Sequence, residues 1–157
     1  MSLTLQSEHF ENGGEIPQLY TCDGKDLPPA LHWSNLPPST HSLALIMDDP
    51  DAPDPTAPQR TWVHWVLFNI PPTSDGLPEA GQKELPSGTQ VGINDWQRPG
   101  YGGPCPPIGR HRYYFKLYAL DIKLEGLNEP TKSDLEKAMQ GHMLDHAELV
   151  GLYQRVK

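Results

Sequence analysis

Several features are scarce in this sequence of 157 residues, and each scarcity excludes a class of protein. The two cysteines, Cys22 and Cys105, cannot form the disulfide framework of a small secreted domain, and neither lies in a Cys-x-x-Cys motif. No apolar run approaches the roughly 18 residues of a membrane-spanning helix. The first residues show no basic stretch followed by an apolar one, so we expect no signal peptide and a cytoplasmic protein.

Basic residues are also few. Lys and Arg total 12 against 20 Asp and Glu, which gives a net charge of −8. Binding to nucleic acid and docking on an anionic membrane both depend on clustered Lys and Arg. We therefore expect no nucleic-acid partner and no stable membrane insertion, and we interpret the dispersed acidic residues as a solvated surface.

Proline and glycine, in contrast, are abundant, with 18 and 14 residues. Because proline costs about 3 kcal/mol inside a helix, the chain cannot be mostly helical. Its hydrophobic fraction of 36% is sufficient for a packed core. The length is typical of one domain, and we predict a single domain over residues 1–157.

Apolar runs predict the strands. The three strongest are residues 42–49, 61–70 and 111–121, and a short one covers 3–6. Residues 61–70 are apolar on both faces, which favours a central position in a sheet. The second half of 146–156 favours a last strand over a second helix.

The remaining segments are predicted from proline, glycine and capping signals. Four prolines predict that residues 50–58 are neither strand nor helix, and residues 7–41 and 71–110 are expected to be mainly loop. A helix is predicted over 133–141, with a Ser133–Glu136 capping box and Gly141 as its stop. Dominant strands with long non-helical connections indicate a mainly β protein with antiparallel pairing, Greek-key-type connections and a peripheral C-terminal helix.

Polar residues stand beside apolar strand faces at three places. Leu43, Leu45 and Met47 share one face with Asp49, which the sequence DPDAP follows. Trp62 and His64 are expected on the same face as Val66 and Phe68. His111 and Tyr113 begin a strip with Phe115, Leu117 and Ala119, after a Pro- and Gly-rich loop. A surface turn and a core histidine are the simpler interpretations of the first two, yet all three could converge on one small anion pocket.

Catalytic and metal sites are less well supported. Cys105 with His111 and Asp49 is the one set that suggests a nucleophile, but prolines flank Cys105, and no Gly-x-Ser-x-Gly motif is present. His142 and His146 have the spacing of a zinc pair, although Gly141 is expected to end the helix before them. We expect no enzyme, no cofactor and no metal. Cys22 and Cys105 are either packed loop residues or a redox-dependent clip across two loops.

Longer segments resemble a known family. DPDAP at 49–53, TWVHW at 61–65 and GYGGPCPPIGRHRYYF at 100–115 resemble the phosphatidylethanolamine-binding protein family, in its bacterial Raf-kinase-inhibitor-like branch. YTCDG at 20–24 and GHMLDHAELVGLYQR at 141–155 add to the resemblance. The resemblance implies two antiparallel sheets with an anion pocket at one end, and bacterial relatives suggest a homodimer.

The resemblance also implies the pocket residues. By position, the ligand-binding residues are Asp49, Ala52, Pro53, Trp62, His64, Gly103, Pro107, His111 and Tyr113, and Tyr101 is placed to close the pocket. His64 and His111 would donate hydrogen bonds to a small phosphorylated or carboxylate ligand, and Asp49 would orient a histidine. The function expected is binding of a small anion or phosphoryl group. The alternative is a protein-interaction or inhibitor module, a kinase or protease regulator, whose pocket reads a phosphorylated or acidic group of a protein partner.

Overall fold

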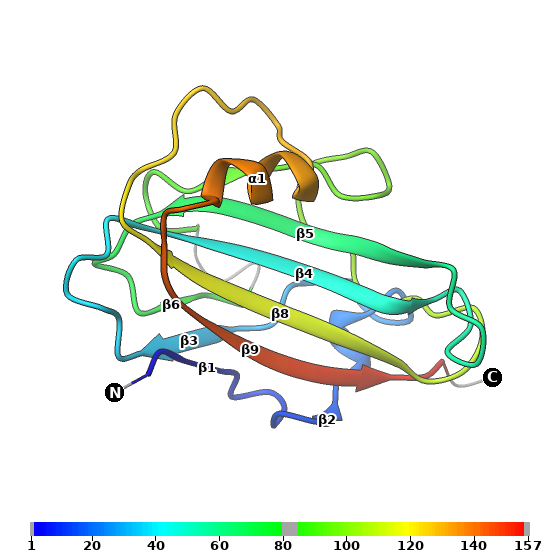
Figure 1. Ribbon diagram of the computed structural model, residues 1–157. Helices are drawn as coiled ribbons and strands as arrows, with labels where there is room; N and C mark the ends of the chain where they lie inside the picture. The colour runs from blue at the N-terminus through cyan, green and yellow to red at the C-terminus, as the bar shows by residue number, and fades with distance from the viewer. Residues whose placement is uncertain (1, 80–84, 156–157) are drawn as a thin grey trace.

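The computed structural model describes residues 2–79 and 85–155. It contains a larger and a smaller β-sheet and one short α-helix, which confirms the predicted fold class (Figure 1). In the described residues, no helix combines the length and the apolar character that crossing a membrane would require.

The larger sheet has six strands in the order β2-β9-β8-β4-β5-β7. They are β2 Gly14–Glu15, β4 Ser42–Ala52, β5 Arg60–Ile70, β7 Gln90–Val91, β8 His111–Leu120 and β9 Met143–Tyr153. All pairings are antiparallel except that of β2 with β9. The predicted last strand therefore begins earlier than expected, at Met143, and residue 156 lies outside the described residues.

The central position predicted for residues 61–70 belongs to β4, which has long neighbours on both sides. β5 pairs with β7 at Leu67 and Phe68 alone. Farther along its outer edge, the backbone N–H groups of Asp95 and Gly102 donate to the carbonyls of Val63 and His64. β5 is apolar on both faces without being central because its two faces pack in different core clusters, one with Trp65 and Leu67 and the other with Val66 and Phe68.

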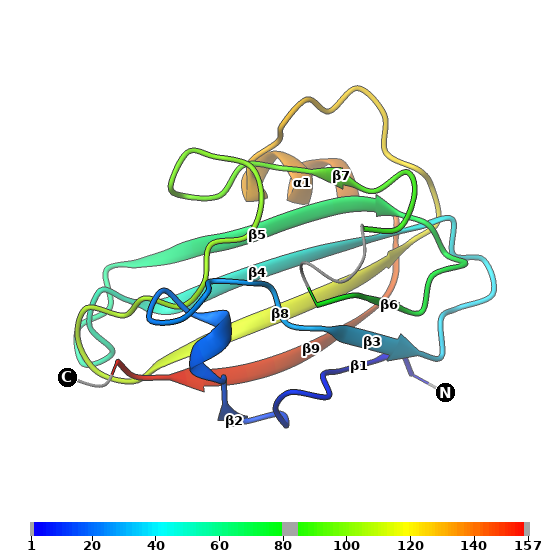
Figure 2. The same ribbon diagram turned by 180° about the vertical axis from the view of Figure 1, so that it is seen from behind.

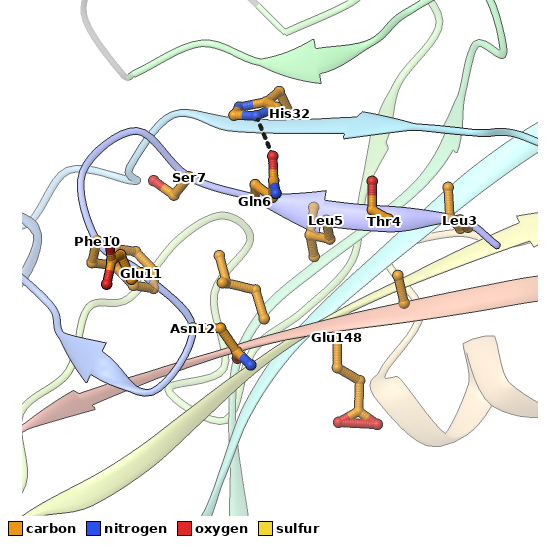
Figure 3. Close-up of a pocket in the computed structure, with 12 residues that line it drawn as sticks. Leu3, Thr4, Leu5, Gln6, Ser7, Phe10, Glu11, Asn12, His32 and Glu148 are labelled. Carbon is orange, nitrogen blue, oxygen red and sulfur yellow. Dashed lines mark hydrogen bonds between the residues drawn. The ribbon is translucent and has the colours of Figure 1, made fainter. Parts of the chain in front are cut away.

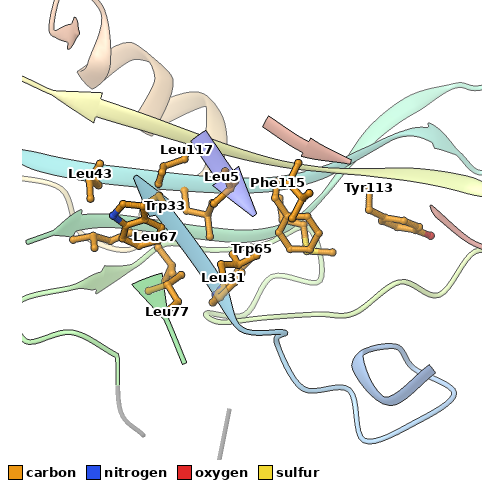
Figure 4. Close-up of a cluster of buried hydrophobic side chains, with 14 of the residues drawn as sticks. Leu5, Leu31, Trp33, Leu43, Trp65, Leu67, Leu77, Tyr113, Phe115 and Leu117 are labelled. Atoms are coloured by element: carbon orange, nitrogen blue, oxygen red, sulfur yellow. The ribbon is translucent and has the colours of Figure 1, made fainter. Parts of the chain in front are cut away.

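The smaller sheet has the order β1-β3-β6. Its strands, β1 Thr4–Gln6, β3 Leu31–Ser34 and β6 Gly76–Leu77, cross one face of the larger sheet (Figure 2). Leu5, Leu31 and Trp33 from this sheet pack with Leu67 and Phe115 from the larger one in the main core (Figure 4). β3 and β6 lie within segments predicted to be mainly loop, as does the 3-10 helix Gln18–Tyr20.

The helix α1, Lys132–Met139, covers the opposite face of the larger sheet. Leu135 and Met139 pack there in a second core cluster with Ile46. The predicted capping box is wrong by two residues: Thr131 Oγ1 accepts from the Asp134 N–H, and Asp134 accepts from the Thr131 N–H. Thr131 has the extended backbone of an N-cap, whereas Ser133 is already helical. Gly141 follows the helix with a φ of 81°, as expected of a helix stop.

β4 also corrects the sequence analysis, because it continues through Pro50 to Ala52. The register with β5 is irregular between Asp49 and Ala52, and pairing resumes at Ala52 with Arg60. Pro50 has no N–H to donate to a neighbouring strand. Because the irregular register leaves Pro50 outside the paired positions, the strand loses no interstrand hydrogen bond there. The strand therefore carries Asp49 and Ala52 to the end of the sheet where β5 and β8 also present polar residues.

Candidate functional site

A pocket of about 400 Å³ lies where the end of β4 meets the starts of β5 and β8. Twelve residues line it: Asp49, Ala52, Pro53, Arg60, Trp62, His64, Trp96, Cys105, Pro106, Pro107, His111 and Tyr113. Eight of the ten residues expected to bind ligand are among them. Tyr101 and Gly103 are not.

A β-bulge directs His64 into this pocket. Met47 pairs with Trp65, but the next residue, Asp48, pairs with Val63, so that His64 is the extra residue on β5. Beyond the bulge the faces are exchanged. Val66 and Phe68 belong to the core cluster under α1, whereas Trp62 and His64 line the pocket on the other side. The prediction that these four residues share a face was therefore wrong, because strict alternation holds only in a regular strand.

The expected partnership between Asp49 and a histidine is present. His111 Nδ1 lies 2.6 Å from Asp49 Oδ2, and both side chains are buried. His111 Nε2 lies 2.8 Å from the carbonyl oxygen of Ile108, which can only accept, so Nε2 carries a proton. The bridge to Asp49 holds a second proton. Burial raises the pKa of the Asp49 carboxyl although the hydrogen bond from His111 acts to lower it.

The two imidazoles therefore differ in what they offer a ligand. Both ring nitrogens of His111 have protein partners. His64 Nδ1 lies 2.7 Å from the Gly102 carbonyl oxygen and donates to it, while His64 Nε2 is buried with no partner in the described residues. Burial lowers the pKa of His64 to about 4, against the raising effect of the Gly102 carbonyl. Near neutral pH the free Nε2 is thus a hydrogen-bond acceptor.

Tyr113 contributes a second buried polar atom, its hydroxyl, which makes no hydrogen bond of regular geometry in the described residues, although the Asp49 carboxyl is close enough to interact with it. Its ring stacks at 6.3 Å on His111 and meets the edge of His64 at 5.2 Å. Burial and the nearby Asp49 carboxyl raise the pKa of this hydroxyl, so it stays a donor at neutral pH. Because buried polar atoms are normally satisfied, two such atoms at one pocket indicate that something other than the protein hydrogen-bonds them.

Tyr101 and Gly103 support the pocket loop from behind. The Tyr101 hydroxyl donates to the Tyr20 carbonyl at 2.7 Å, and its ring meets Trp65 at 5.3 Å. The Gly103 N–H donates to Asp26 Oδ1 at 2.8 Å, and a Cβ at Gly103 would collide with Asp26 and the Tyr20 carbonyl. These contacts join the loop before β8 to the segment around Tyr20.

The structure joins Cys22 and Cys105 in a disulfide across the same two loops. Of the two alternatives left open by the sequence, the clip is therefore the one observed. The Cys22 N–H also donates to the Pro104 carbonyl beside the disulfide. Because the sulfur of Cys105 is bonded to Cys22, it does not act as a thiolate nucleophile toward His111 in this state.

Four lining residues were not among those predicted to bind ligand. Cys105 and Pro106 belong to the Pro- and Gly-rich loop already singled out, whereas Arg60 and Trp96 escaped the sequence analysis altogether. Arg60 lies two residues before Trp62, and the alternation of the strand could have placed it on the pocket side. Trp96 comes from the loop before β8, and its ring packs against His64 at 5.0 Å and against Trp62 at 5.6 Å. A Cβ at Gly102 would collide with the Trp96 ring, which explains a glycine there. No sequence pattern predicts this long-range contact.

A second hollow of about 490 Å³ lies between β1 and β9 (Figure 3). Several of its polar side chains have partners, such as His32 Nε2 with Gln6 Oε1 at 3.0 Å, and the carboxylates of Glu11 and Glu148 would repel an anion. Among the described residues, no buried polar side-chain atom without a partner belongs to this hollow. The pocket at His64 is therefore the better candidate.

The spacing of His142 and His146 does not produce a metal site in the described residues, where no cluster of three or more potential ligands occurs. His142 Nδ1 lies 2.9 Å from Asp121, and the His146 ring lies beside Tyr118. Both have the structural surroundings that the sequence analysis favoured.

The fold is that of a β protein with two packed sheets and a small pocket at the strand ends. The sequence model of the phosphatidylethanolamine-binding protein family matches residues 6–154. The chain belongs to this family.

Relatives cover the whole chain. A protein called UPF0098 protein from Methanothermobacter thermautotrophicus is 49% identical over 157 residues, covering 98% of this chain and 99% of its own. The crystal structure of a phosphatidylethanolamine-binding protein homologue from Chlamydia trachomatis has a TM-score of 0.91 at 37% identity, covering 99% of both chains. YbcL of E. coli, described as a new member of the mammalian family, has a TM-score of 0.87 at 30% identity, covering 99% of this chain and all of its own.

Proposed function

We propose that this protein binds a small anion, of the phosphoryl or carboxylate type, in the pocket around His64, and that it does so without turnover. The observation that carries the proposal is the pair of buried polar atoms without a regular hydrogen bond, His64 Nε2 and the Tyr113 hydroxyl. The family name and the name of the Chlamydia relative, both of which refer to a phosphorylated lipid, support the phosphoryl class.

The proposed binding mode assigns different roles to the two histidines. The Tyr113 hydroxyl donates to one ligand oxygen, and Arg60 supplies positive charge at the pocket wall. His64 Nε2 and a second ligand oxygen share one proton, which comes either from solvent or from a P–OH group of the ligand. The Asp49–His111 pair acts as a positioning unit, because its hydrogen bonds hold the ring that stacks on Tyr113.

The test is a calorimetric and NMR titration with inorganic phosphate at pH 6, using the wild type, His64→Ala and the control His146→Ala. His146 is exposed on β9 and far from the pocket lining. We expect saturable binding with shifts at residues 49–53, 60–64 and 105–113, lost in His64→Ala and kept in the control. Absence of saturable binding at millimolar phosphate would contradict the proposal.

A protein-interaction or inhibitor role is the second candidate, and one observation favours it. Ile108 is 54% exposed beside Pro107, which lines the pocket, so its side chain is available to a partner that covers the pocket. In this reading an acidic or phosphorylated side chain of a partner enters the pocket while Ile108 contacts the partner surface. An Ile108→Ser variant that keeps phosphate affinity but loses a partner would favour this role. The predicted homodimer and cytoplasmic location stay predictions.

A further inference from the structure

The arginines of this acidic protein fall into two groups. Arg110, Arg112 and Arg155 lie 2.8 to 3.2 Å from the carboxylates of Glu15, Asp51 and Asp23. Arg60 and Arg98 have no carboxylate partner among the described residues, although acidic residues outnumber basic ones 20 to 12. Arg60 lines the His64 pocket, and Arg98 lies over the ring of Trp96, which lines the same pocket. We call this part of the pocket rim its mouth.

Aromatic rings hold the two guanidinium groups there. Arg60 Cζ lies 5.9 Å from the centre of the Trp62 ring, and Arg98 Cζ lies 5.7 Å from that of Trp96. The two indoles meet edge to face at 5.6 Å. At the mouth, the two indole rings therefore lie between the two guanidinium groups. Cations of the protein already occupy ring surfaces that would otherwise attract a cationic ligand.

The turn that carries Trp96 and Arg98 is held firmly. Asn94 Oδ1 accepts from the N–H groups of Trp96 and Arg98, and Asn94 Nδ2 donates to the Gly100 carbonyl at 3.1 Å. Asn94 itself is 1% exposed, whereas Trp96 is 36% exposed. A rigid turn that presents a large aromatic ring and an unpaired charge to solvent is preorganised for an external partner.

We propose that this mouth is a second anionic subsite, so that the preferred ligand carries a second negative group beside the one held at His64. The inference rests on the proposed function, since it concerns the same pocket. Arg60 and Arg98 attract the second group and repel a ligand whose substituent is an ammonium. Arg60 and Arg98 are thus specificity-determining residues, and a phosphorylethanolamine headgroup, whose substituent is an ammonium, is disfavoured relative to a phosphoester whose substituent is a carboxylate.

Three probes of similar size test the charge of the substituent: ethyl phosphate, O-phosphorylethanolamine and phosphoglycolate. They carry, respectively, no further charge, an ammonium and a carboxylate. Dissociation constants are measured by calorimetry at pH 7.5 and low ionic strength. We expect phosphoglycolate to bind about tenfold more tightly than O-phosphorylethanolamine, with ethyl phosphate between them, as is reasonable for partly exposed charges a few ångströms apart.

The variants Arg60→Gln and Arg98→Gln should each reduce that affinity ratio by about threefold, and the double variant should bring it close to one. Arg110→Gln is the matched control, because it removes the same charge from an exposed arginine that pairs with Glu15 outside the pocket lining. It should leave the ratio unchanged.

The outcomes separate the two proposals. Binding of all three probes with equal affinity, or a ratio that survives the double variant, overturns the second subsite and leaves the anion pocket standing. Tighter binding of O-phosphorylethanolamine than of phosphoglycolate overturns it as well. Failure of all three probes to bind overturns both the subsite and the proposed function.

Discussion

Asp48 and Asp49 are neighbours on β4 with opposite surroundings. Both are buried, at 1% and 3% exposure, but they lie on opposite faces of the sheet. Asp48 Oδ2 accepts from Lys132 Nζ at 2.8 Å and from Lys116 Nζ at 3.2 Å, so its charge is matched by protein cations. Asp49 belongs to the pocket, where His64 and Tyr113 keep polar atoms without a regular hydrogen bond.

The difference teaches how to separate a structural ionic cluster from a binding site. On the Asp48 face, Arg112 donates from Nε and Nη2 to both oxygens of Asp51, which lowers the pKa of Asp51. Arg112 is thus an ion-pair residue on the face opposite His111. The buried carboxylates Asp48 and Asp51 thus have basic partners, whereas the pocket face leaves donor and acceptor capacity for something external.

The largest expected effect comes from the cross-link on the pocket face. The double variant Cys22→Ser/Cys105→Ser opens a link between positions 83 residues apart, and the chain-entropy relation predicts a loss of about 4 kcal/mol of unfolding free energy. Phosphate affinity should fall with it, because Cys105 and Pro106 line the pocket. Urea unfolding and calorimetry measure the two effects. Two free thiols in the oxidised, denatured wild type would contradict the cross-link itself.

The next largest expected effect is a loss of unfolding free energy at acidic pH. Because burial lowers the pKa of folded His64 from 6.5 to about 4, the unfolded chain binds more protons between these values. The contribution of the neutral His64 ring to the unfolding free energy is fully present above pH 6.5. It falls by about 3 kcal/mol as the pH decreases toward 4. His64→Gln cannot titrate, so this part of the loss should vanish from its urea midpoints at pH 7 and pH 4.5. Identical pH dependence in variant and wild type would refute the assignment to His64.

His64 also predicts how binding depends on pH. Sulfate does not titrate above pH 4, so a sulfate that hydrogen-bonds Nε2 must draw a proton onto the ring. Sulfate affinity should therefore rise by up to about tenfold for each unit of pH decrease from 7 to 5. Because burial lowers the pKa of His64 from 6.5 to about 4, the rise continues well below pH 6.5. The His64→Gln variant should bind sulfate with little pH dependence, and a flat wild-type profile would contradict the proton bridge.

On the other face, Asp48→Ala should cost about 2 kcal/mol in unfolding free energy. The variant leaves two lysines without their shared carboxylate, although their side chains, 20% and 26% exposed, can turn partly to solvent. Phosphate affinity should not change. A loss of affinity comparable to that of His64→Ala would erase the distinction between the two faces.

The smallest effect is expected at Arg112, whose side chain is 51% exposed. Arg112→Met should destabilise by less than about 1 kcal/mol, because solvent screens such pairs. Its phosphate affinity should match that of the wild type, and a clear reduction in a calorimetric titration would place Arg112 in the binding machinery.

Local patterns predicted much of this molecule. The runs around Leu45, Val66 and Phe115 gave correct long strands, since apolar patterning follows directly from burial in a sheet. Strand alternation also predicted that Asp49, His111 and Tyr113 lie at the end of an apolar face. The short strands β3 and β6 were missed, because too few residues carry a signal and their pairing partners are distant in the chain.

What the sequence determined by itself is the set of long strands, the family resemblance and most of the residue types at the pocket. The tertiary structure decided which atoms remain free. The bulge at His64 exchanged the faces of β5, and the Ile108 carbonyl accepts a hydrogen bond from His111 Nε2, which leaves that nitrogen unavailable to a ligand. The loop around Asn94 brought Trp96 and Arg98 to the mouth of the pocket. These outcomes depend on contacts between distant segments, and such contacts leave no periodic trace in the chain itself.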